Sequence, residues 1–210
     1  MVEPVTNLDS GRVRANLERI REQAGPDVEI LAATKYIRNE DMGALADAGI
    51  TLVGENRLQD LEEKRERWGD RFTWDFIGNL QSRKLKRILP LVRLIHSLAS
   101  DSALEQLGRH GGPSTEVLVE VNLSGEEEKG GIDPGGLDEF IERCPVSVSG
   151  LMTMPPFTED PEASRPYFAR LAELASERDL ERLSMGTSQD WPVAVQEGAT
   201  IIRLGSVLWA

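Results

Sequence analysis

Short runs of apolar and β-branched residues recur along the chain, and each run is bounded by turn residues. These runs occupy residues 29–35, 51–56, 73–79, 94–100, 115–122, 148–154, 182–188 and 199–206. Most of them are mixed or continuously apolar, as expected for strands that are covered on both faces. The pattern therefore predicts eight strands of a parallel sheet.

Segments with helical periodicity or helix-start signals lie between these strands. They cover residues 39–48, 57–67, 101–109, 134–143, 161–177 and 189–197, and an amphipathic stretch at 10–24 precedes the first strand. Strands that alternate with helices indicate parallel βαβ units, and eight such units suit a closed barrel. We predict an α/β fold in which residues 1–210 form a single (β/α)₈ TIM barrel with an extra N-terminal helix. A doubly wound open sheet is the alternative that the pattern leaves open.

Composition narrows the class of protein further. The chain has 210 residues, with 36 acidic against 24 basic side chains, so its formal net charge is −12. This balance argues against broad binding to nucleic acid or to an anionic membrane, because both require a basic surface. The single Cys144 excludes an internal disulfide framework and a cysteine-based zinc site. No apolar run approaches the ~20 residues of a membrane span, and the N-terminus has no leader pattern. We expect a cytoplasmic protein.

Polar residues follow nearly every predicted strand. They are Lys35, Asn56, Asn79, Ser97 or Ser100, Asn122, Thr153, Ser184 to Ser188, Arg203, Gly205 and Ser206. In a (β/α)₈ barrel the C-terminal strand ends form the active face. Their shared position therefore predicts one polar pocket at that face.

Lys35 is the one lysine at a predicted strand end, and it follows the apolar run from Ile30 to Ala33. Apolar walls disfavour the ammonium form, which prepares the amine to attack an aldehyde and form a Schiff base. A solvated lysine at a strand end is the alternative that this residue alone leaves open.

The last two predicted strands lead into loops rich in glycine and hydroxyl groups, LSMGTSQD and IIRLGS. Backbone N–H groups and hydroxyls bind phosphate readily, and the loops after strands 7 and 8 are the usual phosphate site of such barrels. Each loop alone could be a tight turn. Together with a lysine at the same face, they predict a ligand with both a phosphate and an aldehyde. Pyridoxal 5′-phosphate (PLP) has that combination.

Arg203 lies two residues before Gly205 and so shares its face of the strand. A guanidinium stays protonated, so at a pyridine nitrogen it would donate a hydrogen bond without protonating the ring. Such a partner weakens the ring as an electron sink. An ion pair at the barrel mouth is the alternative. His96 has no second histidine or carboxylate at ligand spacing, so we expect it to lie in the core or to support the site indirectly.

The chain resembles the YggS/PROSC family of pyridoxal phosphate homeostasis proteins over almost its whole length. The segments that carry the resemblance are AATK (32–35), GENRLQDLEEK (54–64), WDFIGNLQSRK (74–84), IHSLAS (95–100), VEVNLSGEEEKGGI (119–132), GLMTM (150–154), LSMGTSQDW (183–191) and EGATIIRLGS (197–206). Many motifs in the right order make this match more specific than any single motif.

The resemblance implies a fold-type III barrel like the N-terminal domain of alanine racemase, without the β-domain of that enzyme. It implies PLP held as an aldimine on Lys35, with Arg203 at the pyridine nitrogen and Asn56 in the pocket beside the ring. The phosphate contacts that it implies are Ser184, Ser188, Gly205 and Ser206. Many family members have histidine where Asn79 stands, so no imidazole role carries over to this position.

The family implies a PLP-binding protein that holds or carries the cofactor in intracellular PLP homeostasis, with no catalytic residues and no metal. PLP-dependent apoenzymes would be the recipients, and we expect a monomer. The alternative is a PLP-dependent racemase or decarboxylase with weak activity. Racemisation needs acid/base groups on both faces of the ring. Lys35 could serve one face, and the tyrosines available for the other are Tyr36 and Tyr167. A lyase or isomerase acting on a phosphosugar through Lys35 is a third possibility.

Overall fold

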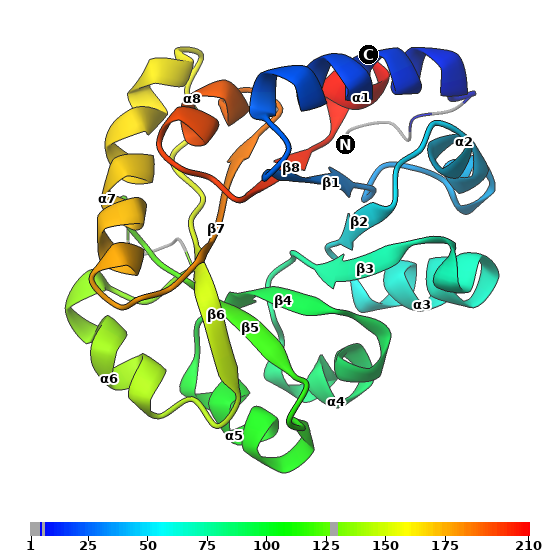
Figure 1. The fold of residues 1–210 in the computed structure, drawn as a ribbon. Coiled ribbons are helices and arrows are strands. Elements are labelled where there is room, and N and C mark those ends of the chain that lie inside the picture. The colour runs from blue at the N-terminus through cyan, green and yellow to red at the C-terminus, as the bar shows by residue number, and fades with distance from the viewer. Residues whose placement is uncertain (1–4, 6, 127–129) are drawn as a thin grey trace.

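The structure is a computed structural model that describes residue 5 and residues 7–126 and 130–210. Within these ranges, eight strands pair in parallel in the order β1 to β8 and close into a barrel (Figure 1). Closure occurs where β1 pairs with β8, with Leu31 opposite Arg203. The closed ring confirms the predicted (β/α)₈ barrel and excludes the doubly wound open sheet, in which two strands would be unpaired edges.

The strands are shorter than the sequence runs that predict them. Their bounds are β1 (Glu29–Ala33), β2 (Leu52–Glu55), β3 (Thr73–Phe76), β4 (Leu94–Leu98), β5 (Glu116–Glu120), β6 (Ser147–Met152), β7 (Arg182–Thr187) and β8 (Ile201–Leu204). Each predicted segment extends beyond the last residue of its strand, in most cases into the turn at the C-terminal face of the barrel. Lys35 and Asn56 lie in such turns, directly beyond the sheet.

Helices follow the strands around the outside of the barrel (Figure 1). They are α1 (Ser10–Ala24), α2 (Met42–Asp47), α3 (Leu58–Trp68), α4 (Leu85–Ile88), α5 (Asp101–His110), α6 (Leu137–Glu142), α7 (Arg165–Ser176), α8 (Trp191–Gln196) and α9 (Ser206–Trp209). The extra N-terminal helix is confirmed as α1, whereas α4 and α9 are absent from the sequence prediction. Within the described ranges, no helix is long and apolar enough to cross a membrane.

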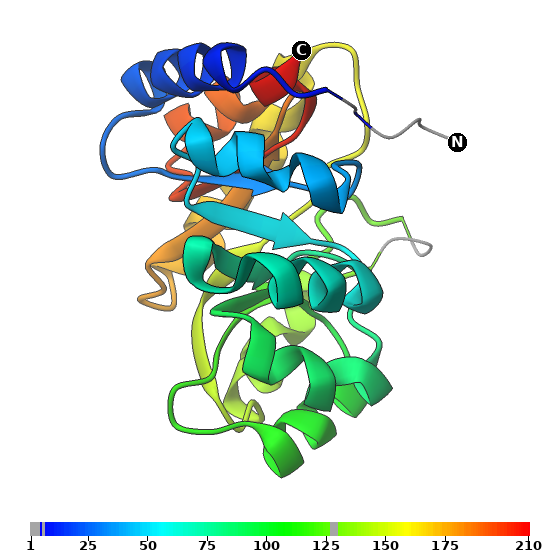
Figure 2. The same cartoon turned by 90° about the vertical axis from the view of Figure 1, so that its right-hand side faces the viewer.

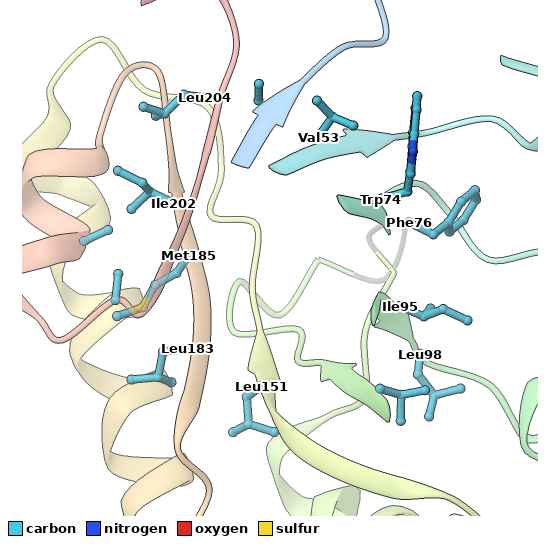
Figure 3. Close-up of a cluster of buried hydrophobic side chains, with 14 of the residues drawn as sticks. Val53, Trp74, Phe76, Ile95, Leu98, Leu151, Leu183, Met185, Ile202 and Leu204 are labelled. Carbon is cyan, nitrogen blue, oxygen red and sulfur yellow. The ribbon is translucent and has the colours of Figure 1, made fainter. Parts of the chain in front are cut away.

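Apolar side chains form two layers, because successive residues of a strand point to opposite faces. The layer between strands and helices includes side chains from β2, β3, β4, β6, β7 and β8 (Figure 3). The other layer fills the barrel interior and is formed by Leu31, Leu52, Leu94, Leu118, Met152 and Ile201.

Three polar side chains share this interior with the apolar layer: Asp75, His96 and Ser184, each fully buried. Below them, at the N-terminal ends of the strands, Arg93 makes an ion pair with Glu29. Above them, Arg203 lies buried near the C-terminal end of β8. Polar groups therefore extend from one end of the barrel to the other.

Candidate functional site

A cavity of about 430 Å³ lies at the C-terminal ends of β1, β2, β7 and β8. Six of the seven residues predicted as cofactor contacts line it: Lys35, Asn56, Ser188, Arg203, Gly205 and Ser206. Its volume falls within the ~300–1,000 Å³ that is typical of small-molecule and cofactor sites. The lysine after the first strand and the two loops after the last strands therefore face a common space.

Lys35 lies in the turn after β1 and is exposed at the mouth of the cavity. Its Nζ lies 4.9 Å from the centroid of the Tyr36 ring, which is within range of a cation–π contact. Among the described residues, apolar side chains do not bury the amine, contrary to the expectation from the residues before it. Its closest described neighbour of note is the aromatic face of Tyr36.

A buried set of three side chains holds the chain directly before Lys35 and Asn56. We call Thr34, Glu55 and Lys64 the β1–β2 clamp. The Lys64 Nζ donates to the Thr34 carbonyl at 2.7 Å and to Glu55 Oε1 at 2.6 Å. The Thr34 hydroxyl donates to the same carboxylate oxygen at 2.5 Å. Burial raises the pKa of the Glu55 carboxyl, and the neighbouring Lys64 ammonium opposes that rise. The clamp fixes the two strand ends from which the two cavity residues project.

The Asn56 side chain has an unsatisfied oxygen. Its Oδ1 is buried and has no hydrogen-bond partner among the described residues. Buried polar atoms in native proteins normally have a partner. Because Asn56 lines the cavity, a ligand with a hydrogen-bond donor would satisfy this oxygen.

The loops after β7 and β8 are joined to each other. The Gly205 N–H donates to Ser188 Oγ at 2.9 Å. The backbone N–H and the hydroxyl of Thr187 both donate to Asp190 Oδ1, at 2.7 and 3.0 Å. These contacts fix the loops, and the hydroxyls of Ser188 and Ser206 line the cavity.

Arg203 forms part of the cavity wall, and its guanidinium is held by three contacts. It donates to Ser184 Oγ at 2.6 Å, to the Thr153 carbonyl at 3.0 Å and to Met154 Sδ at 2.8 Å. Burial lowers the pKa of Arg203 to about 10, although the charges of Glu120 and Asp190 oppose the shift. The group therefore still carries its positive charge at neutral pH.

Ser184 is the one predicted cofactor contact that the structure does not bring to the cavity lining. Its side chain is fully buried, and its hydroxyl contacts Arg203 and the His96 ring instead. The strand pattern explains the difference, because Ser184 lies within β7 whereas Ser188 lies in the loop after it.

We call the cavity described above the first compartment. A second compartment of about 400 Å³ adjoins it, and the two share Asn56, Ile77, Met154 and Arg203 in their walls. Asn79 and Glu120 line this compartment. Burial raises the pKa of the Glu120 carboxyl, and the charge of Arg203 opposes the rise. Glu120 was not predicted as a site residue because the predicted strand ended at Asn122. Strand alternation from the interior Leu118 nevertheless places Glu120 on the same face.

The residues around these compartments fit a ligand with an aldehyde, a phosphate and a polar ring. Lys35 offers a primary amine, Ser188 and Ser206 offer hydroxyls, and Arg203 offers a cationic donor. The unsatisfied Asn56 oxygen adds an acceptor. Fold and site together define a (β/α)₈ barrel with a cofactor-type site at the C-terminal ends of its strands.

Comparison with known proteins places the chain more closely. It belongs to the family of the alanine racemase N-terminal domain, whose model matches residues 8–210, and within it to the pyridoxal phosphate homeostasis proteins. The pyridoxal phosphate homeostasis protein of Aquifex aeolicus is 39% identical, over 94% of this chain and 94% of its own length. That of Pseudomonas aeruginosa is 33% identical, over 94% and 92%.

Solved structures agree with this assignment. PipY of Synechococcus elongatus, solved with PLP bound, is 31% identical, with a TM-score of 0.82 over 94% of this chain and all of PipY. Alanine racemase from Corynebacterium glutamicum has a TM-score of 0.75 at 14% identity and matches over 60% of its length. This second likeness shows the common fold.

Proposed function

We propose that this protein binds PLP through Lys35 and serves intracellular PLP homeostasis by holding and passing on the cofactor. One observation carries the proposal: the Lys35 amine and the hydroxyl-bearing loops after β7 and β8 line the same cavity, with Arg203 in its wall. The relatives named for PLP homeostasis and the PLP-bound PipY structure support it.

Each residue contributes a distinct interaction to this function. PLP supplies an aldehyde that reacts with a primary amine, and Lys35 provides that amine. Ser188 and Ser206 bind the phosphate through their hydroxyls, in loops that the Gly205 N–H contact holds together. Arg203 donates a hydrogen bond to the ring nitrogen but keeps its own proton. Asn56 lies beside the ring.

Weak or absent catalysis follows from the same residues. The titratable side chains that line the two compartments, among the described residues, are Lys35, Tyr36, Glu120 and Arg203. An arginine at the ring nitrogen makes the ring a poor electron sink. We therefore assign the protein a carrier role rather than a strong enzymatic one.

Glu120 favours one alternative, a PLP-dependent racemase or decarboxylase with low activity. Glu120 is a carboxyl group that lines the second compartment, and burial raises its pKa, so it is the side chain there that would act as a general acid or base. Exchange of an amino acid's α-proton for deuterium, abolished by Glu120→Gln, would indicate this enzyme. The carrier proposal expects no exchange above that of free PLP.

The broader assignments are also proposals. Residues 1–210 act as one barrel domain that works as a monomer in the cytoplasm. Among the described residues the exposed large apolar side chains are few, namely Tyr36, Met154 and Phe157. Tyr36 and Met154 are exposed and also line the first compartment. The compartment therefore opens to the surface, where a PLP-dependent apoenzyme would receive the cofactor.

The proposal is tested at the proposed anchor. Borohydride reduction of the PLP-loaded protein should fix the cofactor to Lys35, as peptide mapping would show. Lys35→Ala should abolish this covalent attachment and leave the protein folded, since the residue is exposed beyond the sheet. Lys86→Ala on the exposed face of α4 is the matched control and should retain attachment. Reduction that labels Lys35→Ala at the wild-type level would reject Lys35 as the anchor.

A further inference from the structure

A continuous chain of hydrogen bonds crosses the barrel interior beneath the first compartment. We call Arg203, Ser184, His96, Asp75 and Arg93 the buried relay. Arg203 contacts Ser184 Oγ at 2.6 Å, and this hydroxyl lies 2.8 Å from His96 Nδ1. His96 Nε2 lies 3.1 Å from Asp75 Oδ2, which accepts from Arg93 at 2.7 Å. The relay links the cavity wall to the opposite end of the barrel.

The direction of each hydrogen bond follows from the chemistry of the groups. The Arg203 guanidinium can only donate, so Ser184 Oγ accepts from it. The one hydroxyl hydrogen of Ser184 is then free to donate to His96 Nδ1. Asp75 as a carboxylate accepts from His96 Nε2–H and from Arg93. A neutral His96 with its proton on Nε2 satisfies every contact, and the burial that lowers the pKa of His96 favours the neutral ring.

Stability gives little reason for such a chain. Its neighbours in the barrel interior include Leu31, Leu118 and Ile201. Replacing buried polar or charged networks by well-packed apolar residues is often neutral or stabilising. A polar chain at this depth is therefore better explained by what it holds in place.

The held group is Arg203. Within the described residues, no carboxylate makes an ion pair with this guanidinium, so hydrogen bonds rather than a salt bridge set its orientation. Two of the three contacts come from the segment after β6, namely the Thr153 carbonyl and Met154 Sδ. Met154 is half exposed, which leaves Ser184 as the buried side chain that anchors the Nη1 side.

We propose that His96 and Ser184 are positioning residues, which fix the guanidinium of Arg203 so that its remaining N–H groups face the ring of the cofactor. His96 locks the Ser184 hydroxyl, and Asp75 locks the His96 ring. The ion pair of Arg93 with Glu29 at 2.5 Å anchors the far end. This inference rests on the proposed function for its ligand, but the geometry of the relay exists without the cofactor.

Three variants test the relay. Ser184→Ala removes the contact to Arg203, and His96→Leu removes both ring contacts. His96→Gln retains one donor and one acceptor, so it should restore much of what His96→Leu loses. Ser149→Ala is the matched control, because its buried hydroxyl on β6 has no hydrogen-bond partner among the described residues.

The first measurement uses the protein without cofactor. Hydrogen exchange at the Arg203 guanidinium, followed by ¹⁵N NMR, should be about tenfold faster in Ser184→Ala and His96→Leu, which is the effect of one lost hydrogen bond to a charged group. The second measurement follows PLP release and its visible spectrum in the loaded protein. Release should be about tenfold faster in the same two variants, with a shifted absorption maximum, while His96→Gln and Ser149→Ala stay near wild type.

Unchanged exchange and unchanged release in Ser184→Ala would overturn the proposal. So would equal losses in His96→Gln and His96→Leu, because packing alone would then explain the role of His96. If His96→Leu fails to fold, Ser184→Ala decides the question. A wild-type protein without a PLP adduct at Lys35 would reject the proposed function, whereas the exchange measurement would still test the relay.

Discussion

His96 shows how burial changes the chemistry of a single side chain. Its ring is fully buried among Asp75, Ser184 and the charges of Arg203 and Arg93. Burial lowers the pKa of His96 below that of an exposed histidine. The contact with Asp75 opposes this shift, and the two arginines add to it.

This shift predicts a loss of stability in mild acid. With a lowered pKa, the folded protein binds fewer protons than the unfolded chain below pH ~6.5. The free energy of unfolding should therefore fall as the pH drops from about 7 towards 5, by at most ~1.4 kcal/mol per pH unit from this residue. Urea unfolding at several pH values measures it.

His96→Gln should remove this part of the pH dependence. His110→Gln, at the exposed end of α5, is the control and should retain it. An identical slope in wild type and His96→Gln would show that another group titrates.

Single residues were predictable from sequence where their role depends on strand position and chemistry alone. Lys35, Arg203 and Ser188 lie on the cavity as expected. Ser184 was predicted to line the cavity, but it lies within β7. The residue types of 182–188 do not show where the paired strand ends and the loop begins. The hydrogen-bond partners of His96 come from β3 and β7, and such long-range contacts leave no local pattern.

At the scale of elements, the β1–β2 clamp joins two strands and a helix. Lys64 extends from α3 to the ends of β1 and β2. Its ammonium and the Glu55 carboxylate are almost completely buried. A buried ion pair tolerates the loss of one partner poorly, because the remaining charge stays without compensation.

Lys64→Met should therefore lower the free energy of unfolding by about 3–5 kcal/mol at neutral pH. Adding Glu55→Leu should recover much of the loss, because no uncompensated charge then remains. Urea denaturation measures both, with Lys86→Met on α4 as the exposed control. A single variant as stable as wild type would show that the pair contributes little to stability.

Most elements were predictable because strand and helix signals alternate clearly. The segment between β3 and β4 was not, since its helix α4 has four residues between two short 3₁₀ turns, Ser82–Lys84 and Leu89–Leu91. One helical turn shows no repeated apolar period. The predicted strands extend too far at their C-terminal ends, because the residues of the following turn come directly after the apolar run with no break in the sequence pattern.

At the scale of the whole molecule, the two ends of the described chain meet. Helix α9 lies beside α1 in both views (Figures 1 and 2). Asn16 on α1 donates to the Leu208 carbonyl at 3.2 Å, and the Leu208 side chain is fully buried. Ser206 and Trp209, on the same helix as Leu208, line the first compartment.

Leu208→Ala should therefore weaken stability and cofactor binding together. Truncating a buried leucine costs about 2–5 kcal/mol, and a displaced α9 would move Ser206 away from the proposed phosphate site. Urea unfolding and PLP titration measure the two effects. Val207→Ala, on the partly exposed side of α9, is the control, and normal PLP affinity in Leu208→Ala would contradict the coupling.

The eight strand segments that alternate with helices in the sequence predicted the closed barrel. The contact of α9 with α1 could not be predicted. It joins residues about as far apart in sequence as the chain allows, and a helix of four residues gives no periodic signal. Packing in three dimensions decides where such a short segment lies.

Helix α9 completes the wall of the first compartment only in the folded protein, so a ligand in that compartment binds the native state and raises the melting temperature of the fold. A ligand that binds the native state alone, at a hundredfold excess over its dissociation constant, adds about 2.7 kcal/mol of stability. A simple heating curve would then report how much of a purified sample is loaded, even for anionic ligands that have no colour.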